Sequence, residues 1–544
     1  MFLKQQIMLP RDMWSFIWTM IIQQSYLSLL FLILNIISWN PFTGFVEWLL
    51  YMIHWKTLVY QYVLCLTTLG FGYLNYRFCA VERHICSTRF EKICRALSPS
   101  YIQHFVGSAI LGGIASYCCI CLFQSLDPDE KSLLSSFFYL ESDFEYFFVV
   151  QHGFYTGIMF SLKYFICLLY LIKLSLNQES KSQQITNQMV VILKDSFFCV
   201  LKSIHWYYLL FVLCGPLLEN IFVLVGLKVT TSDSLLNLLY SLANLKLFVL
   251  TFISGVIIFF NWSLFLIIFN AYEAERYIFP IEMPVKSIQN KTLSAVLVNS
   301  GDDILQYLAT MDLRLLSQHD AQRRKLMFAI SHPGGHAHQW KAISDHSISS
   351  LRQFVNKLNE YSVITAGKET KMISGLTTLK ENGLLVKSFP PASPLEKIKS
   401  HLRQRPVVAY FLDELPGTKI QQLFSYSQPL IWMIEALGYF VSASYSEDKF
   451  GVIQQQLPEI ICLLLDIKIA EEKLPVDLVG IRTYVKDPQG RYEHIHQRVA
   501  LKTSVNASLC RIAETFKEDI KGIYLPELYQ IYFQRYLNRS VFDK

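Results

Sequence analysis

The sequence predicts an all-α membrane protein: a six-span transmembrane helical region followed by a cytosolic, mainly α-helical domain. The 544 residues are 52% hydrophobic and only 17% charged, whereas a soluble domain has about 25% charged residues. Before Arg276, long apolar runs alternate with short polar connections, and after it charged residues recur every few positions. We therefore expect a membrane domain over residues 1–276 and a water-facing part after it.

Six apolar runs are long enough to cross a bilayer, because a spanning helix needs about 20 mostly apolar residues. The expected spans are Trp14–Ser38, Thr57–Tyr76, His104–Phe123, Phe147–Lys173, His205–Leu227 and Leu247–Phe269. The first run lacks a small-residue cleavage site and exceeds the length of a signal-peptide core, so we expect it to be retained as a signal anchor.

The charges of the connections predict how the spans are oriented. The second connection, residues 77–103, and the fourth are rich in Lys and Arg, whereas the third is acidic. An excess of Lys and Arg marks the cytoplasmic side of a membrane. We therefore expect the second and fourth connections in the cytosol and the third in the lumen. With six spans, both termini are then cytosolic.

The second connection also contains a candidate membrane surface. Apolar residues recur there at roughly helical spacing among basic ones. The basic residues are Arg77, Arg83, Arg89, Lys92 and Arg95. A basic amphipathic helix can lie on an anionic leaflet. The alternative is a solvated connector whose apolar residues pack on neighbouring spans.

Three parts are expected beyond the spans. A membrane-proximal helical segment covers residues 277–364, with apolar residues at helical spacing in Asp303–Gln318 and again from His338. Pro333-Gly334 between them indicates a turn. Residues 365–394, rich in Lys, Ser, Thr, Gly and Pro, are expected to be a flexible linker.

A C-terminal helical domain is expected over residues 395–544. Its predicted helices are Leu395–Leu412, Thr418–Tyr426, Leu430–Ser444, Asp448–Ile469, Ile495–Lys521 and Leu525–Asn538. Pro458 should kink or divide the fourth of these, and residues 473–493 are expected to form a loop or hairpin.

The residues indicate no catalytic or cofactor chemistry. The sequence has no G-x-S-x-G, no phosphate-binding Gly loop and no H-E-x-x-H. His332, His336 and His338 have no cysteine or acid beside them at ligand spacing, so no metal site is expected there. Lys163 and Glu219 are the only clear charges well inside spans and could form one structural ion pair. A polytopic transporter or a membrane-bound enzyme with a cytosolic regulatory domain remains the alternative function.

Several blocks resemble a known family. They are Leu313–Gln318 with Arg323-Arg324, Ser331–His336, Trp340–Ser344, Val441–Gln454 with Leu457-Pro458, and Glu275–Pro280. These blocks are similar to the corresponding parts of the membrane nucleoporins of the nuclear-division-cycle (Ndc-type) family. The resemblance covers the whole plan of spans, cytosolic termini and helical tail, although the linker here is shorter than in animal members.

The resemblance implies a transmembrane nucleoporin without enzymatic activity. It would lie in the pore membrane of the nuclear envelope, anchor the nuclear pore complex and support its assembly by recruiting soluble nucleoporins. The implied partners are the bilayer, an ALADIN-like WD-repeat protein and a membrane-binding nucleoporin with an RRM-like domain. It implies no cofactor, no direct nucleic-acid binding and no small-molecule substrate.

The residues of these blocks are our candidates for partner binding or for its structural support. They are Leu315, Leu316, Pro333, Gly334, Gly335, His336, Trp340, Tyr445, Glu447, Asp448, Phe450 and Gly451. The block Val441–Gln454 is the best candidate surface, because it places aromatic side chains beside a charged turn, as protein interfaces do. The alternative is that Tyr445 and Phe450 are core residues of a helix–helix corner.

Overall fold

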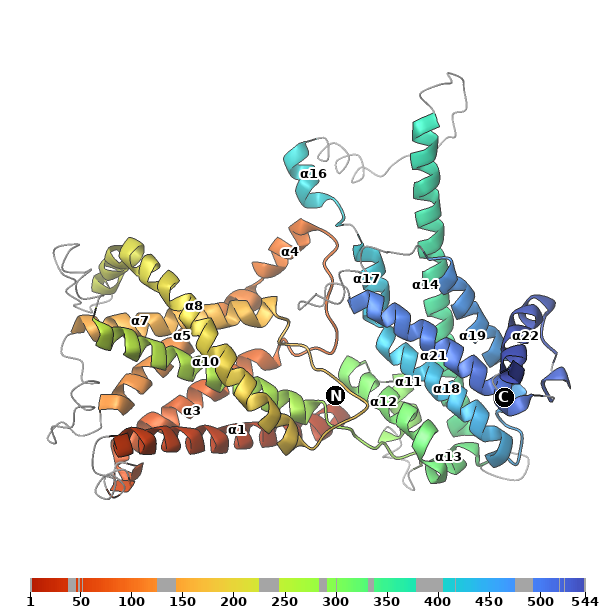
Figure 1. Ribbon diagram of the computed structural model, residues 1–544, viewed down its shortest axis with the longest axis horizontal. Helices are drawn as coiled ribbons and strands as arrows, with labels where there is room; N and C mark the ends of the chain where they lie inside the picture. Colours follow the sequence, from red (N-terminus) through yellow and green to blue (C-terminus); the bar gives the residue numbers. More distant parts are fainter. Residues whose placement is uncertain are drawn as a thin grey trace. The chain divides into compact units, whose positions relative to one another are not determined.

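The computed structural model describes the chain apart from residues 1, 38–45, 47–48, 51, 125–142, 225–243, 283–290, 300, 331–336, 378–404, 416, 475–492, 518, 523 and 543–544. The chain divides into two compact units (Figure 1). The membrane unit comprises Met1–Ala80 and Ala96–Glu275, and the tail unit comprises Val81–Arg95 and Arg276–Lys544. Regular structure in the described residues is helical, with two isolated β-bridges and no strand. The all-α prediction is confirmed for this part of the chain.

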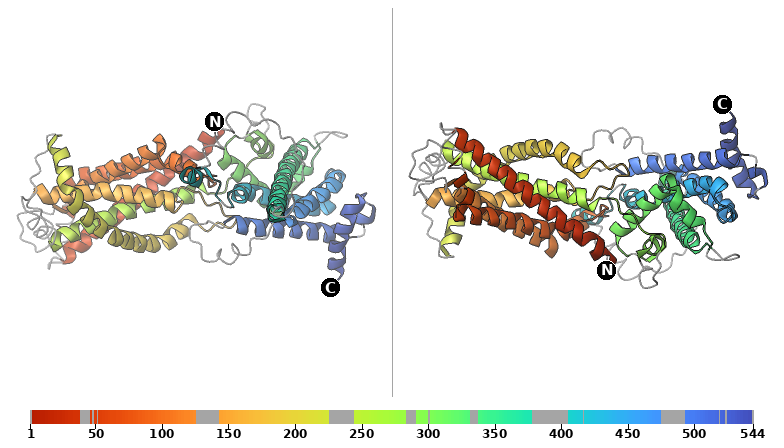
Figure 2. Two further views of the ribbon diagram at one scale, coloured as in Figure 1. Left: turned by 90° about the horizontal axis from the view of Figure 1, so that it is seen from above. Right: turned by 90° about the horizontal axis from the view of Figure 1, so that it is seen from below.

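The described part of the membrane unit contains six long helices, and each overlaps one predicted span. They are α1 (Phe2–Ile37), α3 (Trp55–Tyr76), α5 (Pro99–Gln124), α7 (Asp143–Ile166), α8 (Lys181–Leu224) and α10 (Leu245–Glu273). Within the described residues, α3, α5, α8 and α10 are long and apolar enough to cross a membrane. Both views of Figure 2 show the long helices of this unit side by side.

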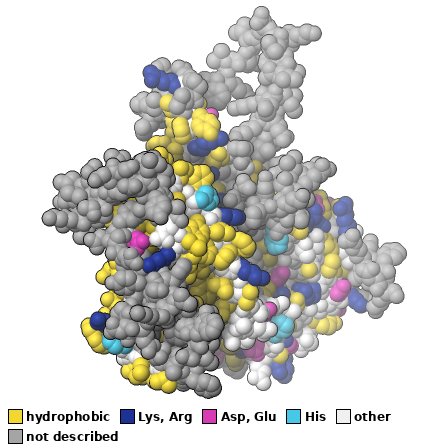
Figure 3. All heavy atoms as spheres, turned by 60° about the vertical axis from the view of Figure 1, so that its left-hand side comes forward, with side chains coloured by type: hydrophobic (Ala, Val, Ile, Leu, Met, Phe, Trp, Pro, Cys, Tyr) yellow, Lys and Arg dark blue, Asp and Glu magenta, His cyan; other side chains and the backbone are white. Residues whose placement is uncertain are grey.

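The membrane unit exposes many large apolar side chains. On α3, Leu58 and Tyr62 are 50% and 63% exposed, and on α8 Val191 is 64% exposed. Figure 3 shows hydrophobic side chains over part of the described surface. Exposed apolar surface of this extent needs an apolar partner, which a bilayer provides for spanning helices.

Close packing of helices holds the membrane unit together. Phe71 of α3 stacks on Trp262 of α10, with ring centroids 4.3 Å apart. Small residues bring α5 and α7 into backbone contact: a Cβ added to Gly157 would lie 2.1 Å from the carbonyl oxygen of Ser108. Helices in membranes commonly associate through such small residues.

Lys163, one of the two charges expected well inside the spans, forms an ion pair with the next long helix. Lys163 of α7 pairs with Asp195 of α8 and also donates to Cys199 Sγ at 3.4 Å. The side chain of Glu219 lies outside the described residues, so the expected Lys163–Glu219 pair stays a prediction. The prediction placed Asp195 in a connection, but the structure extends α8 from Lys181, so Asp195 faces α7 from the same helix as the predicted span.

The tail unit is a bundle of helices of mixed length. It contains α4 (Arg89–Ala96, of which Ala96 falls in the membrane unit), α11 (Leu293–Asn299), α12 (Asp303–His319), α13 (Ala321–Phe328), α14 (His338–Thr377), α16 (Pro406–Leu412), α17 (Thr418–Ser425), α18 (Ser427–Glu447), η2 (Gln454–Gln456), α19 (Leu457–Glu472), α21 (Glu493–Phe516), η3 (Asp519–Gly522) and α22 (Glu527–Phe542). Helix α18 packs against α12 and α21, and α14 packs against α19.

Several predicted boundaries differ from the structure, and two of them in the tail change how the sequence is interpreted. Pro458 does not kink a helix, because α18 ends at Glu447 and Pro458 lies in the first turn of α19, where its missing N–H costs nothing. Helix α14 runs to Thr377, so it continues into the range expected to be a linker. The rest of that range, and most of the loop expected at 473–493, lie outside the described residues.

A buried carboxylate joins the start of the tail to its first helices. Asp312 of α12 is fully buried and accepts two hydrogen bonds from Arg323, at 3.0 and 2.7 Å. It also accepts from the Phe279 amide at 3.1 Å, and Arg323 donates to the Phe279 carbonyl at 2.6 Å. This cluster ties residue 279 to α12 and α13.

Candidate functional site: an aromatic surface at the end of α18

The best candidate surface begins with a rigid loop after α18. The carboxylate of Asp448, itself buried, accepts from the amides of Phe450 at 3.1 Å and Ile453 at 2.9 Å. Gly451 has φ of +66°, a conformation that favours glycine. Asp448 and Gly451 therefore shape the loop and do not offer side chains to a partner.

Glu447 is also structural. Its carboxylate accepts from Arg324 Nε at 3.0 Å and Arg324 Nη2 at 2.7 Å. This bidentate pair joins the end of α18 to α13, and bidentate geometry fixes orientation as well as adding energy. In the charged turn expected beside the aromatic residues, Glu447 is thus in an ion pair with both partners mostly buried and Asp448 is buried, whereas Lys449 is exposed.

Tyr445 and Phe450 lie at the surface. They are 53% and 59% exposed, so the alternative that both are core residues was wrong. The Tyr445 ring meets Phe516 of α21 edge to face, with centroids 5.4 Å apart. The carboxylate of Asp519 raises the pKa of Tyr445. The aromatic surface, defined here as Tyr445 and Phe450, is therefore exposed but held by a fixed backbone.

The remaining candidate residues are either buried to some degree or lie outside the described residues. Leu316 and Trp340 are buried, and Leu315 is half-buried. The Trp340 indole donates to Gln456 Oε1 at 2.9 Å and packs against Phe440. Pro333, Gly334, Gly335 and His336 lie outside the described residues.

The basic second connection is not one amphipathic helix. Only Arg89–Ala96 is helical between α3 and α5. Arg77 belongs to the membrane unit and donates to Gln103 at 3.3 Å, whereas Arg83, Arg89, Lys92 and Arg95 belong to the tail unit. On α4 the side chains of Phe90 and Ile93 are 52% and 43% exposed. The alternative was that apolar residues of this connection pack on neighbouring spans. Phe78 does so, because it lies against Tyr101 and Phe165.

Residues 81–95 pack within the tail unit, which sequence reasoning missed. The Ser87 carbonyl accepts from the Leu415 amide at 3.0 Å, and the Ile85 carbonyl accepts from Gln422 Nε2 at 3.0 Å. The Arg89 guanidinium lies 4.1 Å from the centre of the Tyr410 ring and donates a hydrogen bond to the backbone carbonyl of Tyr410. Spacing along the sequence carries no signal for this contact, because its two sides are more than three hundred residues apart.

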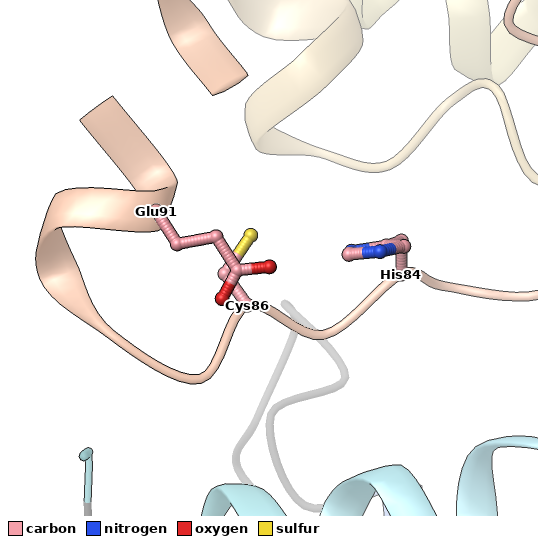
Figure 4. Close-up of side chains that lie close together, drawn as sticks. All are labelled: His84, Cys86 and Glu91. Atoms are coloured by element: carbon pink, nitrogen blue, oxygen red, sulfur yellow. The ribbon is translucent and has the colours of Figure 1, made fainter. Parts of the chain in front are cut away.

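The same segment brings three potential metal ligands together. Donor atoms of His84, Cys86 and Glu91 all lie within 4.8 Å of one another (Figure 4). The sequence carries the spacing H-x-C-x₄-E at these positions, and the predictions above, which named His332, His336 and His338, did not include it.

Comparison with known proteins agrees with this architecture. The sequence matches the family described as Nucleoporin protein Ndc1-Nup over residues 11–393 and 373–530. It is 23% identical to Nucleoporin NDC1 of Danio rerio, over 89% of this chain and 90% of that protein. It is likewise 23% identical to Nucleoporin NDC1 of Mus musculus, over 85% of this chain and 86% of that protein. Nucleoporin Ndc1 of Drosophila pseudoobscura pseudoobscura is 24% identical over 51% of this chain and 55% of that protein.

The match to the family covers both units, from the first long helix to the last helices of the tail. The membrane unit supplies apolar helices of spanning length, as a pore-membrane protein requires. The chain belongs to the Ndc1-Nup family of nucleoporins and is a transmembrane component of the nuclear pore complex, not an enzyme.

Proposed function

We propose that the membrane unit crosses the nuclear envelope six times with both termini in the cytosol, while the tail unit recruits soluble nucleoporins. The chain would thereby anchor the pore complex in the membrane and support its assembly. Membership of the Ndc1-Nup family carries this proposal. The Lys and Arg excess in the second and fourth connections supports the orientation.

Engineered glycosylation acceptors test the topology. Acceptors placed between Asp127 and Glu145 should be modified, because that connection would face the lumen. Acceptors at either terminus or between Arg77 and Gln103 should stay unmodified. Modification at either terminus would contradict the six-span arrangement.

We assign partner binding to the aromatic surface, Tyr445 and Phe450. Exposed aromatic side chains on a fixed backbone contribute much contact area for little loss of side-chain entropy, which is why interfaces favour them. The partner would be an ALADIN-like WD-repeat nucleoporin or the membrane-binding nucleoporin with an RRM-like domain. Glu447, Asp448 and Gly451 would fix the backbone that carries these two side chains.

Co-purification with tagged chain tests this assignment. The double variant Tyr445→Ala, Phe450→Ala should lose one of these two nucleoporins and keep its place in the envelope. Tyr426→Ala is the matched control, because Tyr426 is 58% exposed and precedes α18 at its opposite end, about 28 Å away at 1.5 Å per residue. Equal recovery of both partners by the double variant and the control would place recognition elsewhere.

We also propose that the apolar face of α4 lies on the cytosolic leaflet. Phe90 and Ile93 are exposed beside basic residues that favour anionic lipid. A polarity-sensitive fluorophore on Cys94, which is exposed, should shift to the blue when the chain is moved from zwitterionic to anionic nanodiscs. An unchanged emission spectrum would contradict the proposal.

A further inference from the structure

We propose that His84, Cys86 and Glu91 bind a zinc ion on the segment that joins the second and third predicted spans. A thiol, an imidazole and a carboxyl group are the three donor types that zinc takes in proteins. Their donor atoms already lie within 4.8 Å of one another in the structure. Figure 4 shows the Glu91 carboxylate beside the Cys86 sulfur, with the His84 ring facing both.

The backbone on both sides of Cys86 is fixed by the tail unit. The Ile85 carbonyl is bonded to Gln422 and the Ser87 carbonyl to the Leu415 amide, each at 3.0 Å. Gln422 also donates to Ser87 Oγ at 3.0 Å. Cys86 itself is buried. The backbone that carries the thiol is therefore held before any metal arrives, which lowers the entropy lost on binding.

The start of α4 positions the carboxylate. Thr88 Oγ1 accepts from the Glu91 amide at 3.1 Å, and Glu91 Oε2 accepts from the Ser87 amide at 2.7 Å. This reciprocal arrangement resembles a capping box. It turns the Glu91 side chain back toward the loop and occupies one carboxylate oxygen, so Oε1 is the oxygen assigned to the metal.

Closing the site requires only a small movement. Zinc binds sulfur at about 2.3 Å and nitrogen or oxygen at about 2.0–2.2 Å in tetrahedral geometry, which sets donor–donor separations of roughly 3.3–3.7 Å. A decrease of about 1–1.5 Å from the present limit of 4.8 Å is within the reach of the exposed His84 side chain. Three protein ligands leave the fourth position to water.

The ligand chemistry selects the class of metal. A thiolate is a poor ligand for Mg²⁺ or Ca²⁺, whereas a mixed sulfur, nitrogen and oxygen set suits Zn²⁺. An ordinary cysteine thiol is mostly protonated at neutral pH, so binding must release its proton. Zinc affinity should therefore fall as the solution becomes more acidic.

Bound zinc would cross-link two parts of the segment. His84 and Cys86 lie in the loop that is bonded to residues 415 and 422, and Glu91 lies in α4. A metal joining them would fasten α4 to the part of the tail that already holds the loop. Chelation should then expose the peptide bond after Arg89 to trypsin.

Cobalt substitution in the purified full-length chain tests the site. After removal of bound metal under reducing conditions, one equivalent of Co²⁺ should produce the near-ultraviolet absorption of a cobalt–thiolate bond, and Zn²⁺ should abolish it. Cys86→Ser should remove the band, and His84→Asn should weaken Co²⁺ binding at least tenfold. Cys94→Ser is the matched control, because Cys94 is exposed on α4 outside the cluster, and it should behave as the parent chain.

A second measurement does not depend on any variant folding. Alkylation of the unmodified chain by iodoacetamide, followed by mass spectrometry of each cysteine, should show that Zn²⁺ slows modification of Cys86 but not of Cys94. The absence of a cobalt–thiolate band in the parent chain, or an equal band in Cys86→Ser, would overturn the proposal. Equal alkylation of Cys86 with and without Zn²⁺ would do the same.

Discussion

Neutralising Asp312 should strongly destabilise the tail. In Asp312→Asn the side-chain volume is unchanged, but Arg323 loses the carboxylate that receives two of its hydrogen bonds. Asp312 is fully buried and Arg323 is only 15% exposed. Removing one partner of a buried pair costs about 3–5 kcal/mol. In a unit of this size, each kcal/mol lowers the melting temperature by about 2–4 °C, so we expect a decrease of about 10 °C.

Thermal unfolding of the full-length chain in detergent, followed by fluorescence and by size-exclusion chromatography of heated samples, measures this shift. The control is Arg352→Ala, which breaks the ion pair with Glu459. That pair is 59% and 41% exposed, and exposed pairs contribute about 0–1 kcal/mol. A double variant lacking both Asp312 and Arg323 should be less destabilised than the sum of the two single variants. If Asp312→Asn melts within 2 °C of the control, the carboxylate does not hold the tail in the way argued here.

Three further predictions concern the two units. Gly157→Leu should prevent recovery of monodisperse chain from detergent, because its Cβ would overlap the Ser108 carbonyl, whereas Gly301→Ala, with no atom within 4 Å, should be recovered normally. Trp340→Ala should cost about 3–5 kcal/mol because Trp340 is buried, and a melting temperature like that of the parent chain would contradict its role in the core. Burial lowers the pKa of His346, so the unfolded tail binds this proton more readily and stability should fall as pH drops below about 6.5. His346→Gln should lessen the decrease in melting temperature between pH 7 and pH 5, and an unchanged decrease would show that other groups cause it.

Helices with a strong apolar pattern could be predicted from the sequence. Asp303–Gln318 corresponds to α12, Asp303–His319, and Thr418–Tyr426 corresponds to α17, Thr418–Ser425. Each has apolar residues at helical spacing and a clear boundary. The short helices α11 and α13, of seven and eight residues, were missed. Helix α13 has near its start the polar run Gln322–Lys325, which shows no apolar periodicity, and helices this short depend on tertiary packing.

The role of individual site residues was harder to predict. The block Val441–Gln454 reads as one motif, yet Asp448 is buried and Phe450 is exposed. The position where α18 ends and the positive φ of Gly451 decide which of these side chains point inward and which point to solvent. Neither feature can be predicted from residue type. Similarly, the basic pattern of residues 77–103 indicated a membrane surface but contained nothing to reveal the contact of Arg89 with Tyr410.

The assignment of residues 81–95 to the tail unit has a consequence for how this protein can be divided. The chain passes between the two units at residues 80–81, 95–96 and 275–276. A fragment ending at Arg276 would keep the segment 81–95 but lose its contacts with Tyr410, Leu415 and Gln422. The tail is therefore not an exchangeable module. A chimaera that takes its tail from a relative should also take that relative's counterpart of residues 81–95. Otherwise the new bundle would lack the segment that packs within it.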